Sequence, residues 1–81
     1  MSLLSYSRYY TPEEDQAMVS FLVDSGRYSD LGGNALWQLM EERRLLPGRT
    51  WQSLKERFRK SVRRRLETFH LPEKQRRRLE L

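Results

Sequence analysis

The feature that most constrains this chain is a long apolar seam in its C-terminal half. Six apolar residues follow one another at steps of three or four: Trp51, Leu54, Phe58, Val62, Leu66 and Phe69. That spacing places all six on one face of a helix. It predicts a continuous helix over residues 50–69, capped by Thr50 and followed by Pro72. One helix cannot bury such a face alone, so other helices must cover it.

Two further helices are predicted upstream of this seam. The first begins at Thr11, where a capping hydroxyl is followed by a proline and by a glutamate at the third helical position. It should span Pro12–Ser25 and stop at Gly26. The second should span residues 35–45, because Pro47 and the glycine after it end its apolar stripe. Residues 27–33 are predicted to form a loop.

The expected fold is therefore all-α, a three-helix helix-turn-helix bundle with a long basic third helix. Residues 10–70 should form this domain. Residues 1–9 are expected to be a flexible segment, and residues 71–81 a basic tail or short helix, with a frayed or disordered tail favoured. The predicted core residues are Met18, Phe21, Leu22, Leu36, Trp37, Leu39, Met40, Leu54, Phe58 and Val62, and the predicted core aromatic residues also include Tyr10 and Trp51.

Composition argues against catalysis and against cofactors. The chain has 81 residues, no cysteine and a single histidine, His70. No nucleophile–histidine set, thiolate metal site or phosphate-binding glycine loop can be assembled from it. No apolar run reaches the roughly 18 residues of a membrane span, and no secretory apolar stretch follows Met1. We therefore expect a binding module rather than an enzyme, with no metal, no cofactor and no membrane insertion.

Charge is distributed unevenly along the chain. Residues 1–48 carry four basic and seven acidic side chains, a net charge of −3, whereas residues 49–81 carry twelve basic and four acidic side chains, a net charge of +8. Such asymmetry indicates a polyanionic partner for the C-terminal half. A solvated basic helix with no partner is the alternative.

Several strings resemble a Myb/SANT domain, a homeodomain-like helix-turn-helix fold. Residues 10–15 (YTPEED) resemble its opening, and residues 48–58 (GRTWQSLKERF) resemble its third helix. The three core tryptophans of that family then fall on Tyr10, Trp37 and Phe58. The interval between the first two is longer than in ordinary Myb repeats, which implies an insertion in the first loop.

Two strings narrow the resemblance to the Myb domain of the animal telomeric Rap family. They are residues 33–41 (GNALWQLME) and residues 51–58 (WQSLKERF). This resemblance implies a nuclear, chromosomal protein, with telomeres as one location, that associates with telomere or chromatin proteins. It leaves DNA binding open, since SANT domains often bind protein and the single Rap repeat is regarded as a poor DNA binder by itself.

The outward face of the third helix supplies the candidate DNA contacts. By resemblance, the base-contact candidates are Gln52, Ser53 and Glu56; glutamine can pair with adenine, and glutamate can accept a hydrogen bond from cytosine. The phosphate-contact candidates are the basic residues Arg49, Lys55, Arg59, Lys60, Arg63 and Arg64. Double-stranded DNA is thus the predicted partner, bound by a monomeric domain.

Three other hypotheses about function were considered, of which the first two stay open. A SANT-type module could dock a basic tail on the acidic residues Glu13, Glu14, Asp15, Asp24 and Asp30. The clusters at residues 63–65 and 74–78 could serve nuclear import or loosely grip phosphates. Membrane-surface binding by residues 50–69 is disfavoured, because the core needs their apolar seam.

Overall fold

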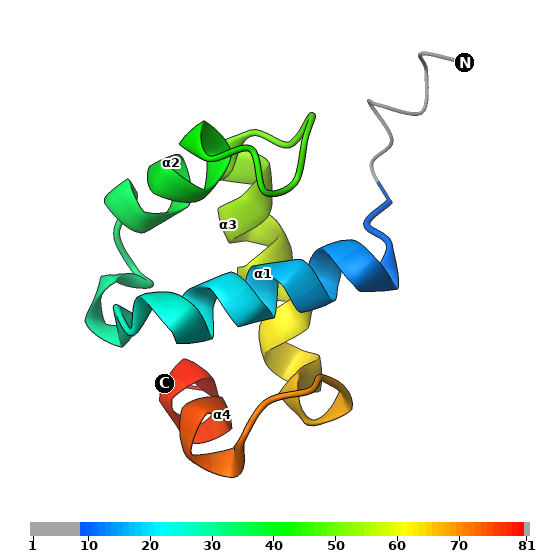
Figure 1. Ribbon diagram of the computed structural model, residues 1–81, viewed down its shortest axis with the longest axis vertical. Helices are drawn as coiled ribbons and strands as arrows, with labels where there is room; N and C mark the ends of the chain where they lie inside the picture. The colour runs from blue at the N-terminus through cyan, green and yellow to red at the C-terminus, as the bar shows by residue number, and fades with distance from the viewer. Residues whose placement is uncertain (1–8, 81) are drawn as a thin grey trace.

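The computed structural model describes residues 9–80, and all regular structure within them is helical. The elements in chain order are α1 (Pro12–Ser25), the 3-10 turn η2 (Tyr28–Asp30), α2 (Ala35–Glu42), α3 (Trp51–Lys60), the 3-10 segment η3 (Val62–Thr68) and α4 (Glu73–Glu80). Helix α1 crosses in front of α3, α2 packs on α3, and α4 folds back against η3 (Figure 1). The all-α prediction is confirmed. The flexible segment predicted for residues 1–9 lies, apart from Tyr9, outside the described residues.

Helix α1 has the boundaries that its sequence predicts. The hydroxyl of Thr11 accepts a hydrogen bond from the Glu14 amide at 3.0 Å, and the Glu14 carboxylate accepts one from the Thr11 amide at 2.9 Å. This reciprocal capping satisfies two backbone donors that the first turn would otherwise leave unpaired. At the other end Gly26 adopts a left-handed conformation (φ 64°) that stops the helix.

Helix α2 ends three residues earlier than predicted, at Glu42. The chain turns at Arg44, which has a positive φ of 54°. This turn carries Leu46 into the core, where it is buried, and leaves Leu45 exposed. The predicted end at Leu45 was therefore wrong: Arg43 caps the helix and the chain turns at Arg44, before it reaches the buried Leu46.

The third helix is shorter than the apolar seam predicts. Helix α3 ends at Lys60, Ser61 leaves the helical conformation, and η3 continues the chain with a second irregular residue at Arg65. The prediction of one continuous helix over residues 50–69 was wrong. Arg57 and Arg65 both bind the Asp15 carboxylate, yet they would lie about 12 Å apart along a straight helix. The bend after Lys60 brings the second arginine to the same acid.

The core forms where α1, α2 and α3 meet, and η3 and α4 complete it. Most of its predicted members are buried, while Phe21 and Leu39 are only partly buried. Among the aromatic residues Trp37 and Phe58 are buried with ring centroids 5.5 Å apart. Tyr10 and Trp51 are partly buried and pack at its margin. The buried hydrophobic residues are Met18, Val19, Leu22, Leu36, Trp37, Met40, Leu46, Leu54, Phe58, Val62, Leu66 and Leu79.

Helix α4 is an integral part of the fold. The sequence favours a frayed or disordered tail here, because Leu79 is flanked by charged residues on both sides. In the structure Leu79 is fully buried, and Arg78 lies over the Tyr28 ring at 4.6 Å. The short helix, one of the two predicted alternatives, is the one that forms. The preference for a frayed or disordered tail was wrong, because one leucine gives no periodicity and its burial site is built by other elements.

Candidate nucleic-acid interface

The first turn of α3 is fixed by its own cap, by a polar contact from α2 and by one from Tyr10, which precedes α1. The Thr50 hydroxyl caps the helix by accepting a hydrogen bond from the Ser53 amide at 3.2 Å. The Glu41 carboxylate, at the end of α2, accepts one from the Trp51 amide at 2.8 Å. The hydroxyls of Tyr10 and Ser53 lie 2.6 Å apart. Ser53, a predicted base-contact residue, therefore has its hydroxyl already engaged within the domain.

Arg49 ties the start of α3 to the start of α1. Its guanidinium makes a bidentate ion pair with Glu14, at 2.8 and 3.1 Å, and lies 3.8 Å from the centre of the Tyr10 ring. These hydrogen bonds lower the pKa of Glu14, whereas burial raises the pKa of Tyr10. Only 10% of the Arg49 side chain is exposed. The structure thus places this predicted phosphate-contact residue in a clamp between two helices, away from the outward face of α3.

A buried carboxylate joins α1 to both halves of the third helical segment. Asp15 accepts two hydrogen bonds from Arg57, at 2.8 and 3.0 Å, and one from Arg65 at 3.0 Å. Burial by itself disfavours the charged carboxylate, but the two guanidinium groups outweigh it and lower the pKa of Asp15. These contacts hold one side of α3 and η3 against α1, on a side of α3 that does not carry the exposed residues Gln52, Arg59 and Lys60.

The outward face of α3 carries four exposed predicted site residues: Gln52, Glu56, Arg59 and Lys60. Glu56 pairs with Lys60 at 2.7 Å and with Arg59 at 3.0 Å. The hydrogen bond from Lys60, followed by the one from Arg59, lowers the pKa of Glu56. One carboxylate against two cations leaves this stretch of the surface positive.

The remaining candidates lie along the same segment. The Lys55 ammonium donates to the Gly32 carbonyl at 3.1 Å and to the Asn34 side-chain oxygen at 2.9 Å, so it faces the loop before α2. Arg63 donates to the Glu80 carbonyl at 3.3 Å, and its guanidinium lies 6.0 Å from the Phe58 ring centre. Arg64 is exposed. Lys55, Arg59 and Arg63 therefore line the same side of the third helical segment, whereas Arg49 lies in the clamp with Glu14.

Two features of this region escaped the sequence reasoning. In the sequence Arg57 and Arg65 look like any other arginines of the basic segment. In the structure both donate hydrogen bonds to the Asp15 carboxylate. Tyr28 was assigned no role from the sequence. In the structure its ring contacts the Arg78 guanidinium, and it lines a pocket that residues of α3 also line. No local pattern reveals these pairings, because each joins residues at least 42 positions apart in the sequence.

The sequence matches the family of the Rap1 Myb domain over residues 10–68. It is 42% identical, over 55 residues, to "Telomeric repeat-binding factor 2-interacting protein 1" of Mus musculus. The matched residues make up 67% of this chain and 14% of that protein. It is 39% identical, over 57 residues, to the protein of the same name from Danio rerio. The matched residues make up 70% of this chain and 9% of that protein. The chain thus spans a small part of the curated relatives it matches.

No solved structure matches the chain. None of the helices between residues 9 and 80 combines the length and the apolar character that a membrane crossing requires.

Proposed function

Because this chain belongs to the Rap1 Myb domain family, we propose that it is a telomere-associated Myb domain that contacts double-stranded DNA through the outward face of α3. The observation that carries the proposal is the division of α3 into two faces. Leu54 and Phe58 are buried, whereas Gln52, Arg59 and Lys60 are exposed. A helix held in this way presents its polar side to a groove, as recognition helices do.

Phosphate contacts would supply most of the affinity. The cations Arg59, Lys60, Arg63 and Arg64 follow one another over the second half of α3 and into η3. DNA binding by such side chains releases condensed counterions, which drives association at low salt. Lys55 is a further phosphate candidate at the edge of this surface. Arg49 is assigned to the clamp with Glu14 instead.

Base reading would depend mainly on Gln52. It lies in the first turn of α3, is exposed, and can form two hydrogen bonds with adenine. The Ser53 hydroxyl is hydrogen-bonded to the Tyr10 hydroxyl, and Glu56 forms ion pairs with two cations. Both residues would therefore be secondary base contacts. We therefore propose weak sequence preference for this single repeat.

Docking of a basic tail on the acidic N-terminal half has less support. Asp15 is buried against Arg57 and Arg65, and Glu14 is paired with Arg49. These acids stabilise the fold and offer little charge to a partner. A nuclear, chromosomal location follows from the proposed association with telomeres.

Charge reversal tests the proposed surface. The variant with Arg59→Glu and Lys60→Glu should lose most of its affinity for a labelled duplex in fluorescence anisotropy, and its salt slope should fall by about two phosphate contacts. Arg27→Glu with Arg43→Glu makes the same change in net charge on other elements and serves as the matched control. Both variants should keep the far-UV helix signal. Equal weakening by the two variants would show that only net charge matters.

A further inference from the structure

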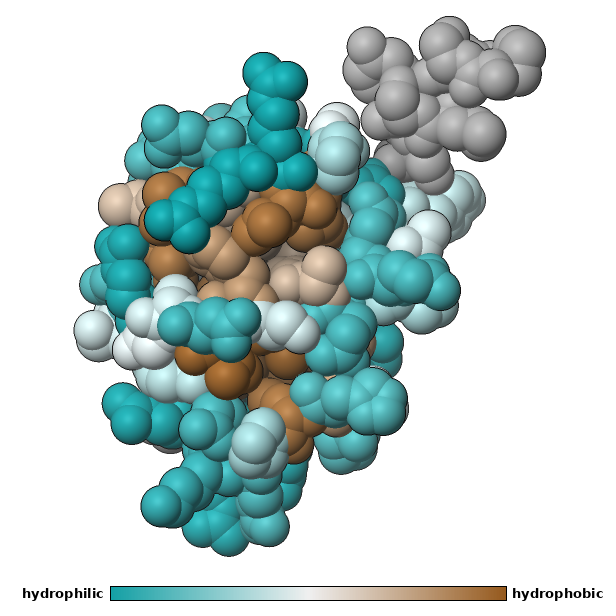
Figure 2. Space-filling model, in the orientation of Figure 1, coloured by the Kyte–Doolittle hydropathy of each residue, from teal (hydrophilic) through white to brown (hydrophobic). Residues whose placement is uncertain are grey.

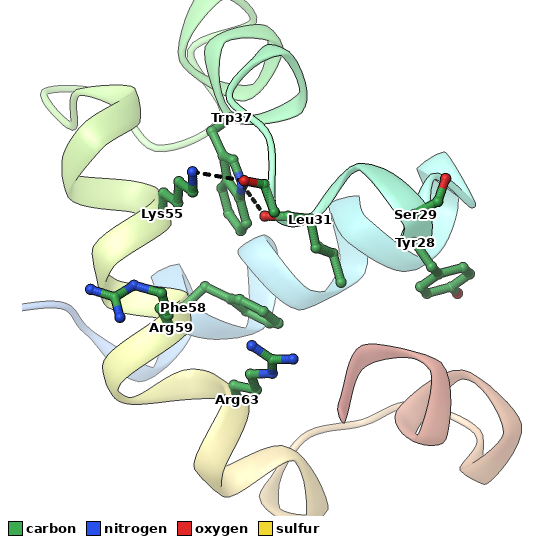
Figure 3. Close-up of a pocket in the computed structure, with 9 residues that line it drawn as sticks. Tyr28, Ser29, Leu31, Trp37, Lys55, Phe58, Arg59 and Arg63 are labelled. Carbon is green, nitrogen blue, oxygen red and sulfur yellow. Dashed lines mark hydrogen bonds between the residues drawn. The ribbon is translucent and has the colours of Figure 1, made fainter. Parts of the chain in front are cut away.

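A pocket of about 500 Å³ lies between η2 and α3. The rings of Trp37 and Phe58 lie at its base but are almost inaccessible, at 0% and 3% exposed. The apolar surface that a ligand can touch is therefore that of the partly buried Leu31 and Tyr28. Lys55, Arg59 and Arg63 project from the α3 side, opposite the residues of η2 (Figure 3). Figure 2 shows apolar residues reaching the surface of the domain within a border of hydrophilic side chains.

The apolar base of the pocket is held in place from within. The Trp37 indole N–H donates to the Leu31 carbonyl at 3.0 Å, which ties the loop after η2 to α2 (Figure 3). The Trp37 ring also packs on Phe58. The volume falls within the range of preformed ligand pockets, about 300–1,000 Å³. It is large enough for one aromatic or leucine side chain of a partner.

The polar rim of the pocket is positive. Lys55 is positioned by two uncharged oxygens, those of Gly32 and Asn34, so these bonds orient its ammonium without neutralising it. Arg59 and Arg63 continue the rim along the third helical segment. A further cation, Arg78 of α4, lies over the ring of Tyr28. Helix α4 lies beyond the matched family region, residues 10–68, so this chain adds a cation beside the pocket from outside that region.

We infer that this pocket docks an acidic peptide segment of a partner protein, one that carries a single large apolar side chain among carboxylates. The apolar side chain would pack against Leu31 and Tyr28, and the carboxylates would pair with Lys55 and Arg78. A duplex backbone matches the pocket less well, because phosphates and sugars offer no large apolar group for it. This inference goes beyond the proposed DNA contact. Because Arg59 and Arg63 serve both surfaces, peptide and duplex should compete.

Two indole signals allow a direct test on the full chain. The probe is a synthetic peptide with glutamates flanking one phenylalanine, titrated into ¹⁵N-labelled protein. The Trp37 indole N–H should shift, since it bonds to the pocket wall, while that of Trp51, at the start of α3, should not. Peptides with lysine in place of glutamate, or alanine in place of phenylalanine, should leave both signals in place. A shift of neither signal, or of both equally, would overturn the inference.

Variants separate this pocket from the DNA surface. Leu31→Asp and, independently, Arg78→Glu should each weaken peptide binding at least about tenfold. Arg43→Glu, on the turn after α2, is the control and should not. Arg78 is exposed, so its variant keeps the test valid if Leu31→Asp unfolds. Duplex binding measured on the same samples should survive Leu31→Asp. If the duplex shifts the Trp37 indole and Leu31→Asp abolishes duplex binding, the pocket binds nucleic acid and the peptide assignment is wrong.

Discussion

Replacing Leu79 by alanine tests whether α4 is part of the folded domain. Leu79 is fully buried among core residues, and the substitution removes three buried carbon groups. At about 0.8 kcal/mol each, these contribute roughly 2.4 kcal/mol, and the cavity left behind raises the expected cost to about 2.5–5 kcal/mol. A domain of this size has a net stability of only about 3–5 kcal/mol. Leu79→Ala should therefore remove most of it.

Thermal unfolding followed by far-UV circular dichroism measures this effect. A loss of about 2.5 kcal/mol should lower the melting temperature by roughly 10–20 °C. Leu45→Ala makes the same chemical change at a leucine that is 43% exposed, so it should cost less than about 0.5 kcal/mol. If the two variants melt together, α4 is a tail, and the packing of Leu79 described above is wrong.

Three further predictions concern the core and the buried carboxylate. Trp37→Ala should cost roughly 3–5 kcal/mol and abolish cooperative melting; a melt near that of the original chain would refute its core role. Asp15→Asn should cost roughly 2 kcal/mol, less than a fully buried ion pair, because its arginine partners are partly exposed. The pKa of Asp15 is lowered in the folded state, so its stabilisation is present above the ordinary value near 3.8 and is lost as the pH falls through the folded value. Melting temperatures measured across that acidic range should therefore fall less steeply for Asp15→Asn than for the original chain, and parallel curves would contradict this.

Local patterns predicted the parts of the fold that local chemistry decides. Helix α1 is an example, since its capping box, its N-terminal proline and the glycine at its end all lie within 16 residues. The predicted core residues of the apolar seam, Leu54, Phe58 and Val62, are buried. Its periodicity continues through Ser61, however, so it could not reveal the bend that the Asp15 carboxylate stabilises from another helix.

The candidate site was predictable as a surface but not as a set of interactions. Exposure of Gln52, Arg59 and Lys60 follows from the position of the seam. The commitment of Arg49 to Glu14, and of Ser53 to Tyr10, depends on how α1 crosses α3. The spacing of residues in the sequence does not predict how the two helices cross. For the same reason it did not predict the pocket beside Tyr28.

A salt series of duplex binding is the decisive test of the proposed contact between α3 and DNA. Anisotropy of a labelled telomeric-repeat duplex and of a scrambled duplex would be measured with this chain over a range of salt concentrations. Contacts by Arg59, Lys60, Arg63 and Arg64 should give a log–log slope of about −3.6 for both duplexes, with at most a few-fold preference for the telomeric repeat. No binding at low salt, or affinity that does not change with salt, would contradict the account.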